Sequence, residues 1–188
     1  MNRSYTVEEN TMKLQDNNEY RTYNLLFPLW LLIWLPSWLW LLLIPLNYLI
    51  DTAVTWYTLR DLEDCRKFCM KNSWKICING FICDFCGSLI LLLILLGASF
   101  LGTLPRISEN QLFEDIVGGI MMNPFTNIGS AIICLIAIVF TAILIYFVDR
   151  KQLCKLGLGI ERATHTAKWL AIITAPYLFL FPSDLLYY

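Results

Sequence analysis

Residues 76–101 read ICINGFICDFCGSLILLLILLGASFL, a continuous apolar run that holds a single charged side chain, Asp84. A helix of about 20 apolar residues crosses the roughly 30 Å hydrocarbon layer of a bilayer, so the run is long enough to span a membrane. Its apolar residues follow one another without the alternation of a half-buried strand. The run therefore predicts a transmembrane helix.

The remainder of the chain has the same character. Of its 188 residues 57% are hydrophobic, more than one soluble core of this size holds. Further apolar runs predict spans at about 37–58, 127–148 and 168–184. We therefore predict an all-α integral membrane protein, with one four-span helical bundle over 23–188 and a polar N-terminal tail over 1–22. A formal net charge of -1 offers no basic face, so the lipid bilayer is an expected partner and nucleic acid is not.

Basic residues concentrate in two of the connections between these runs. Of the 14 Lys and Arg residues, five lie within 60–75 and five within 149–168. If each run crosses once, these two segments share one side of the membrane, and the positive-inside rule makes that side cytoplasmic. The prediction is a multi-pass protein of the cell (cytoplasmic) membrane with both termini outside. A second topology stays open, in which 23–59 is a re-entrant hairpin and the tail lies inside.

Tryptophan indicates how the first span begins. Trp30, Trp34 and Trp38 recur every four residues, and indole rings favour the membrane interface. We expect 24–35 to form a helix near the outer interface, with a break at Pro36 and the first span after it. This aromatic segment would also offer a surface to lipid or to a membrane protein partner.

Two aspartates lie inside the first two spans, at equal distances from the basic segment between them. Asp51 is nine residues before Arg60, and Asp84 is nine residues after Lys75. Nine residues of helix rise roughly 13 Å, so in an antiparallel hairpin both carboxyls would reach one depth, well below the headgroups. This carboxyl pair is the clearest functional feature of the sequence.

Small and polar residues accompany the two aspartates at helical spacing. Residues four apart share one face of a helix. The sets that follow from this spacing are Asn47, Asp51 and Thr55 on the first helix, and Gly80, Asp84 and Ser88 on the second. Equal distances from the basic segment predict that the two sets face each other in reverse order, so that Asp51 lies level with Asp84.

Such a pair needs a proton or a cation. An unpaired ionised carboxylate in the hydrocarbon layer costs on the order of 3 kcal/mol, and two neighbouring carboxyls titrate as one coupled unit. We therefore expect Asp51 and Asp84 to bind H+ or a small cation, with Asn47, Thr55 and Ser88 as further oxygen ligands. The corresponding function is a proton- or cation-coupled carrier, or the membrane subunit of a transporter. In the alternative interpretation, the pair only locks the bundle through hydrogen bonds to neighbouring side chains.

Seven cysteines suggest a different class of function. Cys83 and Cys86 form a C-x-x-C motif that we expect at the start of a helix, where a thiolate is stabilised. The motif resembles that of the quinone-linked disulfide-bond enzymes and of vitamin K epoxide reductase, which implies a membrane thiol-disulfide oxidoreductase. The resemblance covers these two cysteines and the helix count, and the chain lacks a second cysteine pair on the outer side. Reduced thiols that fill apolar space are the alternative.

Other chemistry has less support in the sequence. His165, the only histidine, lies in a basic segment that predicts a solvated side chain. Cys65 and Cys69 could join Cys83 and Cys86 around zinc, but ligands divided between a surface loop and a membrane helix make a poor cage. We expect neither a conventional catalytic site nor a metal or cofactor. A non-catalytic membrane scaffold or interaction subunit, alone or as a homo-oligomer, is the alternative to a carrier.

Overall fold

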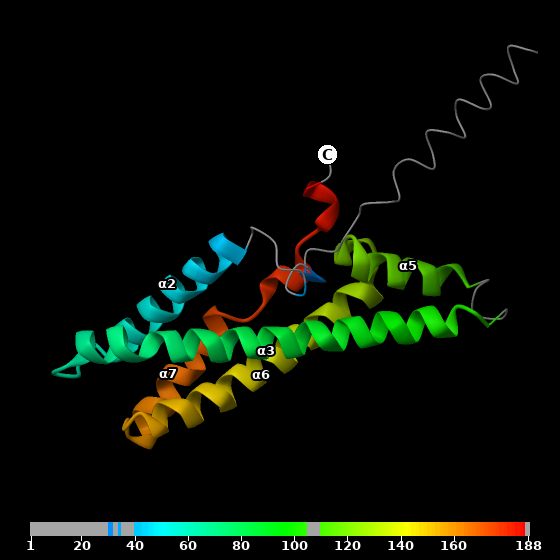
Figure 1. Ribbon diagram of the computed structural model, residues 1–188. Helices are drawn as coiled ribbons and strands as arrows, with labels where there is room; N and C mark the ends of the chain where they lie inside the picture. The colour runs from blue at the N-terminus through cyan, green and yellow to red at the C-terminus, as the bar shows by residue number, and fades with distance from the viewer. Residues whose placement is uncertain (1–29, 32–33, 35–39, 105–109, 187–188) are drawn as a thin grey trace, which may run out of the picture.

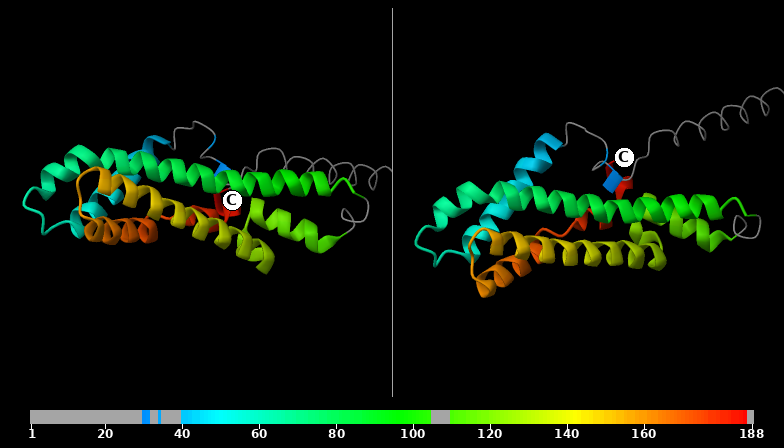
Figure 2. Two further views of the ribbon diagram at one scale, coloured as in Figure 1. Left: turned by 90° about the horizontal axis from the view of Figure 1, so that it is seen from below. Right: turned by 60° about the horizontal axis from the view of Figure 1, so that its bottom comes forward.

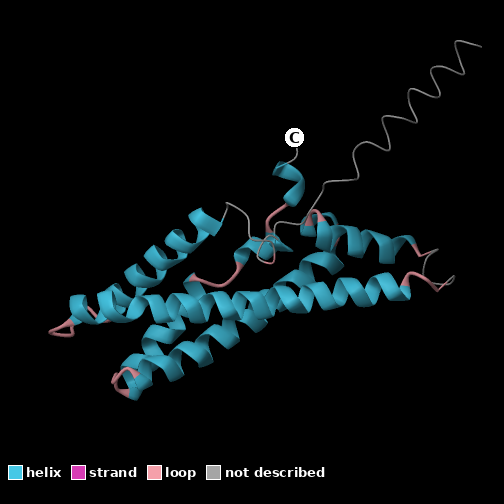
Figure 3. Cartoon of the chain, viewed as in Figure 1, coloured by secondary structure: helices cyan, strands magenta, loops and turns pink. Residues whose placement is uncertain are grey.

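A computed structural model describes residues 30–31, 34, 40–104 and 110–186. The predicted tail over 1–22 and the predicted break at Pro36 lie outside the described residues. Within them the chain is helical and no strand occurs (Figure 3), so the all-α prediction is confirmed.

Two long helices form the frame of the molecule. The α-helices are α2 (Trp40–Thr58), α3 (Cys65–Leu101), α5 (Gln111–Met121), α6 (Ile128–Lys155) and α7 (Ile160–Ile173), and the 3-10 turns are η2 (Pro124–Thr126), η3 (Tyr177–Leu180) and η4 (Ser183–Leu186). Helices α3 and α6 run antiparallel (Figure 1). At one end α2 packs on α3 and α7 packs on α6, and α2 and α7 also contact each other. Four helices therefore enclose one interior at that end, while α5 lies along the other end (Figure 2).

Helix α3 begins well before the predicted span over 76–101. It starts at Cys65 and has 37 residues, about 56 Å at the usual rise. No glycine or proline occurs between Cys65 and Asn79, so nothing in that segment ends a helix. Lys71 and Lys75 consequently lie on the first turns of α3, and the connection from α2 is only a short turn.

The end of the chain differs from the predicted span over 168–184. Helix α7 starts at Ile160 and ends at Ile173, and its 14 residues rise only about 21 Å. Pro176 follows, where a missing N–H and a fixed φ oppose a continuing helix, and the chain proceeds as 3-10 turns. Among the described residues, α3 and α6 are the two helices long and apolar enough to cross a membrane.

Both basic segments lie at the same end of the molecule. The α2–α3 turn and the α6–α7 turn are neighbours in Figures 1 and 2. Because α3 begins at Cys65 and α6 continues to Lys155, most of the basic side chains project from helix ends. We call this the basic end.

The two larger apolar clusters among the described residues lie one in each half of the molecule, and a third, small one is formed by Cys83, Ile145 and Ala171. At the basic end, buried side chains of α2, α3, α6 and α7 meet, among them Val54, Ile76, Leu153 and Leu170. In the other half, α3 and α6 bury Leu91 and Ile138 against Ile120 of α5 and Phe179 of η3.

Helix α5 depends on a glycine for its contact with α6. Asn110 caps the helix by accepting a hydrogen bond from the Leu112 N–H (3.1 Å). The helix continues through Gly119, where a Cβ atom would lie 2.3 Å from Ser130 Oγ. Ser130 is fully buried, and its hydroxyl donates to the backbone carbonyls of Pro124 and Asn127. Gly119 therefore lets the two helix backbones approach closely.

Replacing Gly119 by alanine should destabilise the protein by about 2 kcal/mol, because the new methyl group must displace Ser130 or move α5 away from α6. The neighbouring Gly118 is the matched control, since a Cβ there meets nothing within 4 Å. Gly118→Ala should be neutral or stabilise by up to about 1 kcal/mol through helix propensity. Thermal unfolding of both variants measures the difference, and equal stability would contradict the close contact.

Candidate buried carboxyl site

Three aspartates converge inside the four-helix end of the molecule. Asp51 of α2, Asp84 of α3 and Asp149 of α6 are 4%, 8% and 1% exposed, respectively. Asp51 interacts electrostatically with both of the others. Within the part of the chain that the structure describes, none of the three forms an ion pair with a basic side chain. The site is therefore a cluster of buried carboxyls without a cationic partner.

Asp51 faces α3 about one turn nearer the basic end than the level of Asp84. Its Oδ2 lies 4.0 Å from the position that a Cβ atom of Gly80 would take. The Cys77 thiol lies within hydrogen-bonding reach of the same carboxylate. The sequence predicts that Asp51 lies level with Asp84, but in the structure Asp51 lies level with Gly80. Because α3 already begins at Cys65, the turn from α2 is shorter than predicted, and each residue of α3 lies further from that turn.

Asp84 lies one turn beyond Gly80 on the same face of α3. Its Oδ1 is buried and has no hydrogen-bond partner among the described residues. Thr55, one turn after Asp51 on α2, is fully buried. Asn47, one turn before Asp51, is half-buried.

Ser88 is engaged by a different part of the chain. Its hydroxyl donates to the Phe85 carbonyl (2.9 Å) and accepts a hydrogen bond from Trp34 Nε1 (3.1 Å). The Trp34 ring also packs on Phe85, with ring centroids 4.0 Å apart. Of the predicted oxygen ligands, Ser88 is therefore the one already bound to the N-terminal segment.

Trp30 of the same segment is not part of the exposed aromatic surface that the tryptophan spacing predicts. Trp30 is 2% exposed, and its Nε1 donates to the Ile120 carbonyl (3.1 Å). A ring that packs against α3, α5 and η3 satisfies its indole N–H inside the protein rather than at a membrane interface. Trp38 lies outside the described residues.

Asp149 was missed by the sequence reasoning, which assigned it to the basic segment beside Arg150. Its position on α6 carries a signal nonetheless. Thr141, Ile145, Asp149 and Leu153 recur every four residues, and all four are buried. A carboxyl in register with such a stripe faces the core, whatever its sequence neighbours. Asn79 of α3 lies within hydrogen-bonding reach of it.

Several oxygen atoms of this interior have no hydrogen-bond partner in the part of the chain that the structure describes. They are Oδ1 of Asp84 and Asp149 and the hydroxyls of Thr55, Ser73 and Thr166. A buried polar group without a partner costs about 1–3 kcal/mol, so a protein rarely retains several of them without a use. The three hydroxyl residues are fully buried and come from α2, α3 and α7, the helices that surround Asp51.

The three carboxyls lie on separate helices. Asp51 belongs to α2, Asp84 to α3 and Asp149 to α6, and Asp51 interacts electrostatically with the other two. Within the described residues, no group of three or more His, Cys, Asp or Glu side chains is close enough to hold a metal ion. Neighbouring carboxyls that interact in this way can share a proton.

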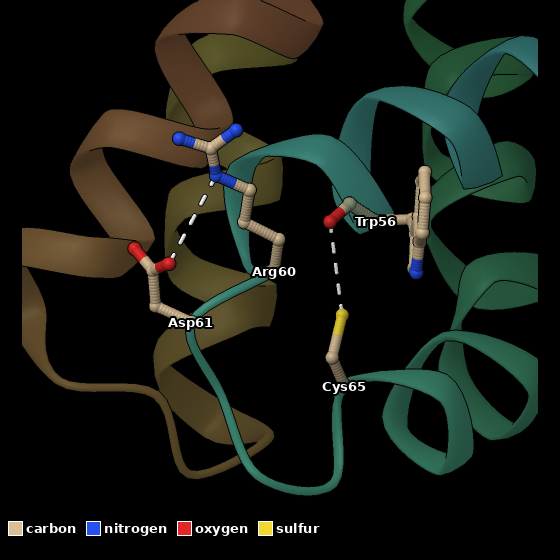
Figure 4. A network of polar contacts seen from close by, with 4 residues as sticks. All are labelled: Trp56, Arg60, Asp61 and Cys65. Carbon is tan, nitrogen blue, oxygen red and sulfur yellow. Dashed lines mark hydrogen bonds and ion pairs between the residues drawn. The ribbon is translucent and has the colours of Figure 1, made fainter.

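A polar cleft at the basic end lies next to this interior. It has a volume of ≈ 390 Å³ and is lined by Thr58, Leu59, Asp61, Leu62, Glu161, Arg162 and His165. Figure 4 shows the turn at its edge, where Arg60 contacts Asp61 (3.9 Å) and Cys65 Sγ donates to the Trp56 carbonyl (3.7 Å). Thr58 follows Thr55 by one helical turn, so the cleft and Asp51 share one side of α2.

The two cysteines of the C-x-x-C motif lie in the middle of α3. Cys83 is 18 residues after the first residue of the helix, so the N-terminal helix dipole does not act on it. Cys83 is buried and Cys86 is half-buried, and both are free. Cys65 and Cys69 lie 4.0 Å apart by their Sγ atoms at the start of α3. A further 14 residues of helix, about 21 Å, separate Cys69 from Cys83, so these four thiols do not surround one zinc ion.

No protein-family model matches this chain, and neither a curated protein nor a solved structure is detectably similar to it. Its function is therefore argued from the site alone.

Proposed function

We propose that the chain is a multi-pass protein of the cell membrane that moves protons, or small cations coupled to them, through the buried carboxyl site. The membrane placement is supported by α3 and α6. Only 33% and 28% of their most apolar segments are buried, whereas the core helix of a soluble protein would be mostly buried. Large apolar side chains therefore face outward, as lipid-facing side chains do.

The basic end indicates how the protein is oriented in the membrane. Its Lys and Arg side chains belong at the headgroup level of the cytoplasmic leaflet. Helices α3 and α6 then cross the bilayer, and α2, together with α7 and the turns that follow it, completes a four-span arrangement. In this orientation the polar cleft opens to the cytoplasm.

The observation that carries the function is the set of three buried carboxyls, Asp51, Asp84 and Asp149, in which Oδ1 of Asp84 and of Asp149 has no hydrogen-bond partner among the described residues. A buried carboxylate without a cation is costly, so each carboxyl must share a proton or bind a cation. A proton that enters the cleft beside Thr58 can reach Asp51 along the α2 face that carries Thr55. From Asp51 it passes on to Asp149 of α6, while Asp84 of α3 also interacts with Asp51.

A second candidate is a non-catalytic subunit of a membrane complex, whose exposed apolar faces bind another membrane protein. The broad apolar exposure of α3 and α6 favours it as much as it favours lipid. In that case the three aspartates lock the helices together, and their replacement changes stability but no flux. A thiol oxidoreductase has less support, because the mid-helix position gives Cys83 no thiolate stabilisation from a helix start.

Proton and cation flux through reconstituted liposomes separates these functions. The full chain should dissipate an imposed gradient faster than protein-free liposomes, and Asp51→Asn with Asp84→Asn should remove most of that flux. Asp115→Asn is the control, since Asp115 is exposed on α5. Equal fluxes for the wild type and the double variant would refute the carrier proposal.

A further inference from the structure

A second cavity lies on the outside of the bundle, between α2 and α3. This groove has a volume of ≈ 390 Å³, within the range of about 300–1,000 Å³ that is usual for small-molecule sites. Trp40 and Ile44 of α2 form one wall, and Phe81, Ile82 and Cys86 belong to the wall on α3. Every lining side chain is apolar or a thiol, so the groove suits a hydrocarbon.

The α3 wall of the groove continues into a pair of lysines. Lys71, Lys75, Ile78 and Ile82 follow at intervals of four, three and four residues, which places them on one face of the helix. Lys71 is exposed and Lys75 is half-buried. Neither forms an ion pair with an acidic side chain among the described residues.

Trp74 marks the same level as these lysines. It is half exposed, and Lys75 Nζ lies 5.7 Å from the centre of its ring. Tryptophan and lysine together are typical of the headgroup region of a bilayer. From Lys75 to Cys86 the helix rises about 16 Å, close to the half-thickness of the roughly 30 Å hydrocarbon layer.

We propose that this groove binds one anionic phospholipid of the cytoplasmic leaflet. One acyl chain lies along the groove between Trp40 and Cys86, and the phosphate is bound by Lys71 and Lys75. The charge of the lysines selects an anionic over a zwitterionic headgroup, as basic pockets on the cytoplasmic side of membrane helices do. The inference rests on the membrane placement in the proposed function but not on proton movement.

Native mass spectrometry of the full chain, purified in detergent and titrated with phosphatidylglycerol or phosphatidylcholine, tests the site. The wild type should retain one phosphatidylglycerol more tightly than phosphatidylcholine. Lys71→Ala with Lys75→Ala should weaken phosphatidylglycerol binding by roughly 30-fold, equal to about 2 kcal/mol for the two lysines together. Lys151→Ala, which removes an exposed cation of α6, should leave the affinity unchanged.

A groove-filling pair of variants tests the acyl chain. Ile82 and Leu93 both lie on α3 and are 57% and 58% exposed, but only Ile82 lines the groove. Ile82→Trp should abolish tight binding of the phospholipid, whereas Leu93→Trp should retain this binding. Equal lipid binding by both variants, or an affinity that does not depend on the headgroup, would overturn the proposal.

The outcomes separate this proposal from the proposed function. If the chain stays in the aqueous supernatant without detergent or lipid, the membrane placement is refuted, and both proposals are refuted with it. Loss of lipid binding in Ile82→Trp with unchanged flux would support the lipid site as an independent feature. A wild type that binds no phospholipid yet dissipates gradients would refute the lipid site alone.

Discussion

Gly87→Ala is expected to destabilise the protein by about 3 kcal/mol, because helices α3 and α6 then cannot keep their separation. A Cβ atom at Gly87 would lie 2.0 Å from Thr141 Oγ1 and 3.1 Å from a ring carbon of Phe179. Thr141 has no room to yield, since it is fully buried and its hydroxyl donates to the Ala137 carbonyl (2.8 Å). The unfolding free energy in detergent measures the effect.

Gly97 on the same helix is the matched control for Gly87. A Cβ there meets nothing within 4 Å, so Gly97→Ala should be neutral or stabilise by up to about 1 kcal/mol. Thr141→Ala should recover part of the loss in the Gly87→Ala background, because it removes the nearest atom. If Gly87→Ala were as stable as Gly97→Ala, the two helices could not approach as closely as the structure shows.

Asp149→Asn is expected to lower proton flux about 100-fold, the usual size of a lost proton-transfer group. Asparagine has nearly the same shape and can keep a hydrogen bond to Asn79, so the bundle should still fold. It cannot take up or release a proton, however, so the proposed path has no carboxyl to continue to after Asp51. Flux in liposomes and thermal stability, measured on the same preparation, check both parts of this expectation.

The Asp115→Asn control removes a carboxylate of similar chemistry from the exposed face of α5. It should change neither flux nor stability, so a general effect of net charge on reconstitution would be visible in it. An Asp149→Asn variant with full flux and a large loss of stability would assign Asp149 to the structural lock instead.

The helical class of the protein could be predicted from its apolar runs, but the helix ends could not. The first ten residues of α3, CRKFCMKNSW, include three basic and two polar side chains, so their hydropathy excludes them from the predicted span even though nothing in them breaks a helix. Helix α5 likewise continues through Gly118 and Gly119 to Met121, although glycine disfavours a helix interior, and Gly119 packs closely on Ser130. Cys65 and Cys69 are buried in the core at the start of α3, a contact that single-sequence patterns do not show.

The candidate site was predicted in part. Burial of Asp51 and Asp84 follows from their place in apolar segments, and Thr55, which the four-residue spacing places on the same face as Asp51, is also buried. Asp149 was not predicted as a site residue, because its two basic neighbours in the sequence assigned it to a basic segment. Its four-residue spacing from Ile145, however, does indicate a buried position. The hydrogen bond from Trp34 to Ser88 joins two residues that are 54 positions apart in the sequence, so no local spacing predicts it.

Infrared spectroscopy of the full chain in lipid vesicles, recorded while the bulk pH changes, tests the central claim most directly. It observes the carboxyls themselves and needs no partner subunit to complete a transport cycle. The account predicts a carboxyl C=O band that responds to pH and weakens in Asp51→Asn, Asp84→Asn and Asp149→Asn but not in Asp115→Asn. A band that ignores pH, or that survives unchanged in all three variants, would contradict a buried carboxyl site that exchanges protons with water.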